Sequence, residues 1–370
     1  MSGKNTSKKE NLFFNPEKKY VGIGLDLAKH FVSVYAIDED GEFAYEPKMP
    51  HEQLLQELAN IKPTPIVMEA CAGSMLLGAK LSEIGQLPHL LPGKIVSSRV
   101  QALFPGKKND RNDAYVMALM AQEGKFYCEI VIKTQLQRRL GSLLVARDQL
   151  ISQRTKLVNA LKGFMQEEGI RLKREGVNAR EISKYQESIE ENEELKLIND
   201  LYRLQIKELT EKIDVLSKRI ESIVKENQIG KNLMTIPGVG SIVAAAFIAI
   251  IGDAKRFNSP KRLCAYLGMV PNDFSSGGKT KMGHISKRGD RMLRKLLVQA
   301  GMVLQHISKS KPDPLKDTKL KEWVEKQRRK TSSNLKLAVA CGTKLAKIAL
   351  AIMQTNEPFQ KSKAAVSIYA

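Results

Sequence analysis

The chain has 370 residues, of which 42% are apolar, so it can bury a sizeable core and form two or three structural units. It carries 60 Lys and Arg residues against 40 Asp and Glu residues, a formal net charge of +20. An excess of this size favours a polyanionic partner such as DNA or RNA, although a ribosome-associated or simply basic protein can share this composition.

The cysteines form no CxxC pair, so neither a zinc site nor a disulfide framework is indicated, and reduced core thiols are expected: Cys71, Cys128, Cys264 and Cys341. No apolar run is long enough to span a bilayer, and no apolar segment of a signal peptide follows the first lysines. We therefore expect a cytoplasmic, nucleoid-associated protein of a bacterium or archaeon without membrane contact. Residues 1–17 are interpreted as a mobile basic arm.

The region from 18 to 133 has the pattern of a mixed α/β domain. Residues 20–27, 30–37 and 42–47 are rich in strand-forming residues around a DEDG turn, which predicts a three-stranded meander. Further segments then alternate: a helix over 51–61, a strand over 65–70, a helix over 74–85, a strand from 89 and a helix over 112–124.

Residues 134–228 are poor in Gly and Pro and dense in charge. A heptad seam runs through Tyr202, Ile206, Leu209, Ile213, Leu216, Ile220 and Ile223, which predicts a coiled-coil helix. A preceding helix over 134–167 is its expected antiparallel or intermolecular partner. Such a seam is usually structural packing, and it indicates dimerisation only if it pairs between chains.

The region from 229 to 354 combines small apolar residues with a basic stretch, and a tail follows over 355–370. IPGVG (236–240) fits a helix–hairpin–helix pattern, whose glycines allow a tight turn that can meet a DNA phosphate. An ordinary helix–turn–helix packing motif explains the pattern equally well. Between Lys255 and Lys295 there are eleven Lys and Arg residues against two acids, and a final apolar helix is expected over 332–354.

Four acids in the first third of the chain suit a metal site: Asp26, Glu69, Asp110 and Asp113. A charge within an apolar strand, as at Asp26, is costly unless it pairs or binds a metal. Asp110 and Asp113 share one helix face. Each acid alone is more often a turn or cap residue. Together they favour Mg²⁺, which takes oxygen ligands and binds phosphate oxygens as well. Their order along the chain is typical of the RuvC branch of the RNase H-like fold.

An SSGG turn lies within residues 265–297, among basic side chains. Serine is a poor nucleophile unless activated, and adjacent cations would stabilise charge on an attacked phosphate. The local pattern alone favours an ordinary loop. The nucleic-acid contacts that we expect are these cations and the glycines of the IPGVG turn: Gly238, Gly240, Lys279, Lys281, Lys287, Arg288, Arg291 and Arg294.

The segments GIGLDLAKHFVSVYAID, VMEACAG and KKNDRNDAYVMALMA resemble the DEDD motifs of the insertion-sequence-110 transposases, which include the 1111 branch and the pilin-gene invertases. The resemblance carries Asp26, Glu69, Asp110 and Asp113 over as the catalytic tetrad. The stretch that ends in ISKRG is similar to the family's second domain, in which a nucleophilic serine precedes glycine. Alignment backwards from Lys287 places this serine at Ser276, with Ser275 as the alternative.

This resemblance implies a Mg²⁺-assisted transposase or recombinase that exchanges strands between donor and target DNA through a covalent serine–DNA link. It also implies a structured guide RNA encoded by the element and a homo-oligomer, either a dimer or a tetramer. Two rival functions remain: a RuvC-like hydrolytic junction nuclease, for which Ser276 would be dispensable, and a non-catalytic nucleic-acid-binding scaffold. We predict an α/β + α fold, with an RNase H-like (RuvC-like) domain, long coiled-coil helices and a mainly helical C-terminal domain with a helix–hairpin–helix-like motif.

Overall fold

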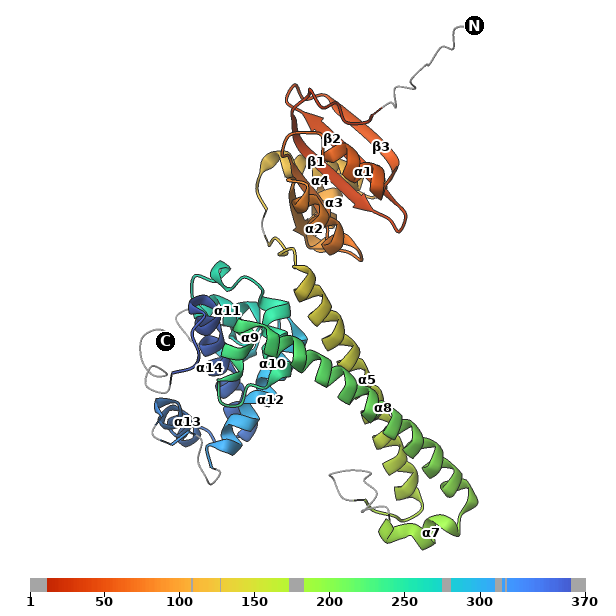
Figure 1. The fold of residues 1–370 in the computed structure, drawn as a ribbon, viewed down its shortest axis with the longest axis vertical. Coiled ribbons are helices and arrows are strands. Elements are labelled where there is room, and N and C mark those ends of the chain that lie inside the picture. Colours follow the sequence, from red (N-terminus) through yellow and green to blue (C-terminus); the bar gives the residue numbers. More distant parts are fainter. Residues whose placement is uncertain are drawn as a thin grey trace. The chain divides into compact units, whose positions relative to one another are not determined.

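Figure 1 shows the chain as a computed structural model, which describes residues 12–107, 109–126, 128–172, 183–274, 281–309, 315–316 and 318–360. The chain divides into two compact units, Met1–Thr134 and Gln135–Ala370. The predicted coiled-coil helices belong to the second unit, together with the C-terminal residues. Within the described ranges, no helix combines the length and the apolar character that a bilayer crossing requires.

The first unit is built on a five-stranded sheet with the order β3-β2-β1-β4-β5. The strands are β1 (Tyr20–Leu27), β2 (Phe31–Asp38), β3 (Phe43–Pro50), β4 (Pro65–Glu69) and β5 (Leu87–Leu91). β1, β2 and β3 form an antiparallel meander, as the sequence predicts, and β4 and β5 continue the sheet in parallel with β1. The central strand β1 is almost completely buried, because helices cover both faces of the sheet.

The helices of this unit are α1 (His51–Leu58), α2 (Ser74–Glu83), α3 (Gly93–Leu103) and α4 (Asp110–Glu123). On one face, side chains from α1 and α2 join those of the strands in a core that includes Ile23, Leu25, Leu54 and Leu81. On the other face, α3 and α4 pack on Val67 and Leu91. All five strands and three of these four helices lie where the sequence pattern predicts them, whereas α3 is an additional helix.

The last part of the predicted basic arm is folded, whereas residues 1–11 lie outside the described residues. Phe14 is only 1% exposed and packs edge-to-face on Tyr20, and its backbone nitrogen donates to Glu57 Oε2 at 2.9 Å. The prediction of a mobile arm is therefore wrong for residues 13–17, because a buried aromatic ring anchors this segment to the core of the sheet. The pattern of lysines around it obscured this anchor.

The second unit begins with a helical hairpin, in which α5 (Gln135–Glu167) packs along α8 (Glu193–Glu226). Arg147 Nε donates to Ser217 Oγ at 2.7 Å, and Arg154 Nη1 donates to Thr210 Oγ1 at 3.3 Å. The opposite order of these pairs shows that the helices are antiparallel. Two positions of the predicted heptad seam, Ile213 and Ile220, are buried. The seam of α8 thus has a partner within its own chain.

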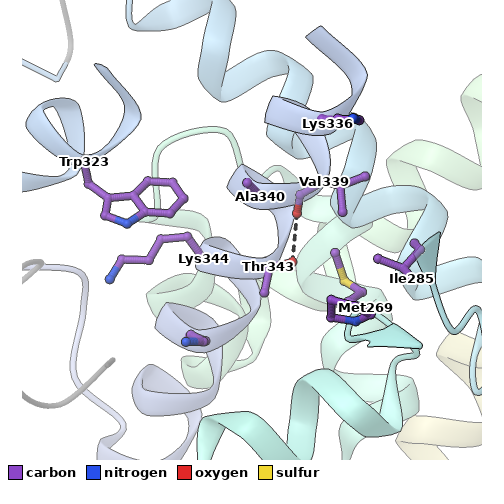
Figure 2. Close-up of a pocket in the computed structure, with 10 residues that line it drawn as sticks. Met269, Ile285, Trp323, Lys336, Val339, Ala340, Thr343 and Lys344 are labelled. Atoms are coloured by element: carbon purple, nitrogen blue, oxygen red, sulfur yellow. Dashed lines mark hydrogen bonds between the residues drawn. The ribbon is translucent and has the colours of Figure 1, made fainter. Parts of the chain in front are cut away.

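The rest of this unit is mainly helical: α9 (Gln228–Met234), α10 (Ser241–Ala246), α11 (Pro260–Tyr266), α12 (Arg291–Ile307), α13 (Lys319–Lys330) and α14 (Asn334–Thr355). α12 crosses α14 through Gly301 and Gly342, since a methyl group on Gly301 would lie 2.9 Å from the backbone nitrogen of Gly342. The short strands β6 (Pro271–Asp273) and β7 (Met282–Ile285) form a two-stranded hairpin. A cavity lies beside α14, near Met269 and Trp323 (Figure 2).

The cysteines are free, and only two of them match the expected core thiols. Cys264 and Cys341 are buried, and burial raises the pKa of Cys341 to about 11. Cys71 and Cys128 are exposed. The expectation of four core thiols is therefore wrong for this second pair, since both lie in connecting segments of the first unit rather than in its helices or strands.

Candidate active site

The sheet of the first unit brings two of the predicted acids together. β1 and β4 run parallel with Leu25 opposite Met68, so the next positions, Asp26 and Glu69, correspond on adjacent strands. Neighbouring strands lie about 4.8 Å apart. Because side chains alternate between the two faces, Asp26 and Glu69 both belong to the face that α4 covers. Both residues are half-buried.

Two glycines let α4 pack directly on β1. A methyl group on Gly22 would lie 2.8 Å from the backbone nitrogen of Gln122, and one on Gly24 would lie 3.0 Å from the carbonyl carbon of Ala114. Two strand residues advance about 6.7 Å, which four helical residues nearly match at about 6 Å. The same progression places Asp26, two residues farther along β1, beside the first turn of α4.

This first turn contains the other two acids. Asn109 caps the helix, since its side chain accepts a hydrogen bond of 2.8 Å from the backbone nitrogen of Asn112. Asp113 is 8% exposed, whereas Asp110 lies at the surface. The dipole of α4 stabilises negative charge at this end. One acid of the pair is thus buried in the fold, and the other remains accessible to solvent.

Gly93, the first residue of α3, lies against the carboxylate of Glu69. A methyl group at this position would lie 3.0 Å from Glu69 Cδ and nearer still to its Oε1. Only a glycine leaves the carboxylate its present place at the beginning of α3. Sequence reasoning missed this residue, although Pro92 directly before it is a frequent companion of a helix start.

Cys71 lies within electrostatic reach of both strand acids. Burial raises the pKa of the Cys71 thiol, and the negative charges of Glu69 and Asp26 raise it further. Among the described residues, however, no three His, Cys, Asp or Glu side chains are arranged to hold a metal ion. The convergence of all four acids on one ion therefore stays a prediction, and it requires some rearrangement of the side chains.

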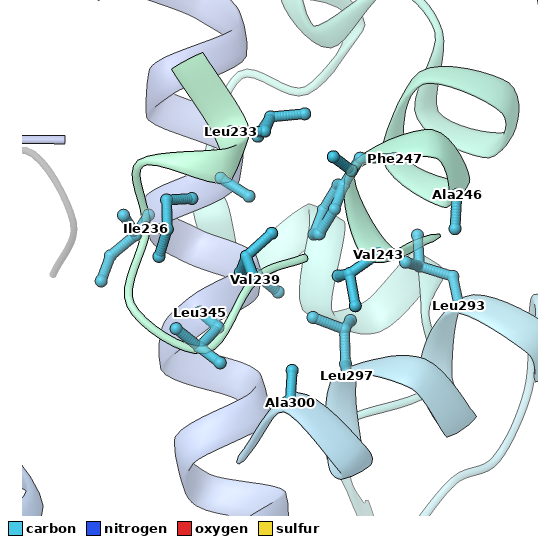
Figure 3. Close-up of a cluster of buried hydrophobic side chains, with 14 of the residues drawn as sticks. Leu233, Ile236, Val239, Val243, Ala246, Phe247, Leu293, Leu297, Ala300 and Leu345 are labelled. Atoms are coloured by element: carbon cyan, nitrogen blue, oxygen red, sulfur yellow. The ribbon is translucent and has the colours of Figure 1, made fainter. Parts of the chain in front are cut away.

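In the second unit, the IPGVG segment forms the turn between α9 and α10. Ile236 and Val239 point into the core beside Val243 and Leu297 (Figure 3). Gly238 has a positive φ of 85°, and a methyl group on it would lie 3.2 Å from the carbonyl oxygen of Ala300. This close approach to α12 gives Gly238 a packing role.

Gly240 differs from Gly238, because it is exposed and a methyl group on it would meet no atom within 4 Å. Of the two glycines in the turn, only Gly240 therefore leaves its backbone open to an incoming phosphate. The packing interpretation thus holds for Gly238, and a phosphate contact at Gly240 stays a prediction.

A second tight contact forms around the ISKRG segment. Gly268 and Gly289 both have positive φ, and a methyl group on Gly289 would lie 3.0 Å from the carbonyl carbon of Tyr266. Lys287 also has a positive φ, 55°, which is uncommon for a residue with a side chain. Its backbone nitrogen donates to Gly268 at 3.0 Å. The turn is therefore fixed by the backbone, and its lysine is held in an unusual conformation.

The basic side chains around this turn differ in their availability. Lys281, Lys287, Arg288 and Arg291 are exposed. Arg294 is half-buried, and its Nη1 donates to the carbonyl oxygen of Leu267 at 3.0 Å, so this residue also supports the fold. Ser276, the alternative Ser275, and Lys279 lie in 275–280, outside the described residues. The flanking strands β6 and β7 bring the two ends of that segment together, with the Phe274 backbone nitrogen donating to Lys281 at 2.9 Å.

Comparison with known proteins identifies both units. Residues 230–314 match a family described as Transposase IS116/IS110/IS902 family, and residues 23–169 match a DEDD transposase family of IS110 type. The transposase for insertion sequence element IS1328 of Yersinia enterocolitica is 30% identical over 92% of this chain and 98% of its own length. The chain belongs to the IS110/IS116/IS902 family of transposases. The IS1111A transposase of Coxiella burnetii is 29% identical over 91% of each chain.

The pilin gene-inverting protein of Moraxella lacunata is also similar, at 27% identity over 35% of this chain and 38% of its own. Within this transposase, the match over residues 23–169 contains all four acids, and the match over residues 230–314 contains the α9–α10 turn and the β6–β7 hairpin. The five-stranded sheet is consistent with the nuclease-like fold of DEDD enzymes. The protein is thus a DNA transposase.

Proposed function

We propose that this transposase cleaves and rejoins DNA through a covalent link between Ser276 and a DNA phosphate, assisted by Asp26, Glu69, Asp110 and Asp113. The observation that carries the proposal is the correspondence of Asp26 and Glu69 on adjacent parallel strands, beside the first turn of α4. Half-buried carboxylates placed side by side repel each other and favour a cation between them. This argument concerns the first unit, and the role of Ser276 rests on the resemblance to the family.

The donor set fits a divalent cation, because carboxylate oxygens are the ligands that Mg²⁺ prefers. We propose that the four acids hold Mg²⁺, with Gly93 leaving room for the carboxylate of Glu69. The bound ion would neutralise charge on a scissile phosphate and on the oxygens that attack and leave it. The acids would hold the ion that faces the phosphate, since carboxylate and phosphate repel each other, and the buried position of Asp113 fixes one member of the set in the fold.

In the proposed reaction, the Oγ of Ser276 bonds to phosphorus while the bond from phosphorus to one sugar oxygen breaks. The hydroxyl proton passes to that leaving oxygen. A sugar hydroxyl of the second strand then attacks the same phosphorus, and the serine regains its proton as it leaves. The number of phosphodiester bonds is unchanged, so no other energy source is needed. Exposed cations such as Lys287 and Arg288 neutralise the phosphate during both steps.

The pilin gene-inverting relatives favour this scheme over hydrolysis, because inverting a gene requires that every cut end be rejoined. We also propose that a structured RNA from the element pairs with donor and target DNA, while the protein holds the backbones through its positive charge. The net charge of +20 accommodates such a partner. Recombination between two DNAs further favours a dimer or tetramer.

An assay of strand exchange tests this function, with the element's flanking RNA supplied. Asp26→Asn should abolish exchange while leaving thermal unfolding unchanged, because it removes a charge but keeps the shape of the side chain. Asp40→Asn, at an exposed position in the β2–β3 turn of the same sheet, is the matched control and should exchange at the normal rate. Exchange by Asp26→Asn at the wild-type rate would contradict the role of the tetrad.

The same assay separates the rival functions. A hydrolytic junction nuclease would release free DNA ends and would tolerate Ser276→Ala. A nucleic-acid-binding scaffold would bind DNA but leave all strands intact, with or without Asp26. Only the proposed mechanism requires both Asp26 and Ser276 for the exchange of strands.

A further inference from the structure

A cavity of about 530 Å³ lies in the second unit, between α13, α14 and the base of the β6–β7 hairpin. Figure 2 shows Trp323 of α13 facing Lys344 of α14, with Met269 and Ile285 on the hairpin side. Its size is within the range of small-molecule sites. Ten described residues line it, three of them are lysines, and none is acidic.

The three lysines project from one helix. Lys336, Lys344 and Lys347 recur on α14 at intervals that bring them to one side, along roughly 16 Å of helix axis. No ion pair to any of the three occurs within the described part of the chain. Lys344 and Lys347 are half-buried, so their positive charges lie in the wall of the cavity rather than in free solvent.

The surroundings of Lys344 favour an anionic ligand. Burial lowers the pKa of the Lys344 ammonium, and the like charge of Lys347 lowers it further. Its Nζ lies 5.7 Å from the centre of the Trp323 ring, which is within the range of a cation–π contact. An anion bound between the two ammonium groups would remove their repulsion, and the indole offers a flat apolar surface beside it.

We propose that this cavity binds an unpaired nucleotide of a nucleic-acid strand, with the base on Trp323 and the phosphate between Lys344 and Lys347. The inference rests on the proposed function, which supplies the nucleic acid. A stacking surface next to lysines is the usual way in which proteins hold single strands. A base within a duplex is already stacked on both faces and cannot occupy the site. Pro271 and Ile285 belong to β6 and β7, so the bound nucleotide lies at the base of the β6–β7 hairpin.

The chain contains a single tryptophan, Trp323, so its fluorescence reports on this cavity alone. The full-length protein is titrated with a ten-nucleotide single-stranded DNA, an RNA of the same sequence and the matching DNA duplex. We expect saturable quenching by at least one single strand and weaker quenching by the duplex. Quenching by DNA assigns the cavity to a substrate strand, and quenching by RNA alone assigns it to the guide.

Variants locate the phosphate and the base. The double variant Lys344→Gln/Lys347→Gln should weaken the quenching at least tenfold. The control Lys207→Gln/Lys218→Gln removes two exposed charges from α8 and should not weaken it. Binding of a fluorescent strand should weaken about 5- to 100-fold in Trp323→Ala and little in Trp323→Phe, which retains an aromatic surface. Equal thermal unfolding of the variants excludes a loss of the fold.

Three results would overturn this inference. They are the binding of single strands without a change in tryptophan emission, equal quenching by duplex and single strand, and quenching that is unaffected by the lysine pair. Each of them leaves strand exchange intact and so spares the proposed function. Conversely, if oligonucleotides quench the tryptophan emission as expected but the protein does not exchange strands, the binding site is supported and the proposed reaction is refuted. A protein occupant, such as a peptide, is indicated if no oligonucleotide changes the emission.

Discussion

Replacing Gly93 with alanine should slow DNA cleavage without unfolding the protein. The new methyl carbon would lie 3.0 Å from Glu69 Cδ, whereas non-bonded carbons pack about 3.5–4.0 Å apart, so the carboxylate must retreat by roughly 0.5–1 Å. A misplacement of about 1 Å in a catalytic group can cost about 100-fold in rate. We therefore expect cleavage to fall by about 10- to 100-fold.

Stability should change little, for two reasons. The atoms that must move are at the end of a flexible side chain, and alanine can adopt the backbone conformation of Gly93, which has no positive φ, so it restricts the unfolded chain and stabilises the protein by about 0.4–1 kcal/mol. The melting temperature of Gly93→Ala should therefore stay within about 2 °C of the wild type or rise slightly. Gly141→Ala in α5 is the matched control, because a methyl group there meets no atom within 4 Å.

The assay is single-turnover cleavage of an end-labelled donor DNA, combined with calorimetric titration of Mn²⁺ as a probe of the tetrad. Gly93→Ala should weaken Mn²⁺ binding in the wild-type background and should have no further effect on it in Glu69→Gln, because both changes act on the same carboxylate. A normal cleavage rate in Gly93→Ala would refute the placement of Glu69. A slow rate with a large fall in melting temperature would instead indicate damage to the fold.

Two further predictions concern binding and assembly. Changing Lys287, Arg288 and Arg291 together to glutamine should weaken the binding of DNA of any sequence. The slope of log affinity against log salt should fall by roughly 2.7, or about 0.9 for each lost phosphate contact. An unchanged slope would exclude these contacts. Leu197 and Leu204 of α8 are 61% and 66% exposed, so glutamate at both positions should convert an oligomer into monomers in light scattering, while a persistent oligomer would place the interface elsewhere.

The alternation of apolar residues was sufficient to predict most of the first unit, because strands and helices there bury one regular face each. α3 was not predicted, because the preceding HLLPG segment has the pattern of a strand that ends in a turn. The helical spacing of Val96 and Val100 was therefore overlooked. The β6–β7 hairpin is too short and too exposed for a periodic signal. Its position follows instead from backbone contacts around Gly268 and Gly289, which only the folded chain reveals.

The candidate site could likewise be predicted only in part. The motifs were enough to select Asp26 and Glu69, and the parallel register of β1 and β4 places them together. Gly93 could not be found in this way, because its role depends on where the beginning of α3 meets β4. The heptad pattern identified α8 and the preceding helix as its partner, but not whether the two pair within one chain or between two, since a seam of buried residues has the same spacing in both cases.

The covalent role of Ser276 is tested most directly by trapping the protein during strand exchange. Labelled donor DNA and the element's RNA are incubated with the full-length protein, and the products are separated under denaturing conditions. The account predicts a protein–DNA adduct that mass spectrometry locates on Ser276 and that is absent from Ser276→Ala. Cleaved DNA with free ends and no adduct in the wild type, or an adduct that persists in Ser276→Ala and is lost in Ser275→Ala, would contradict it.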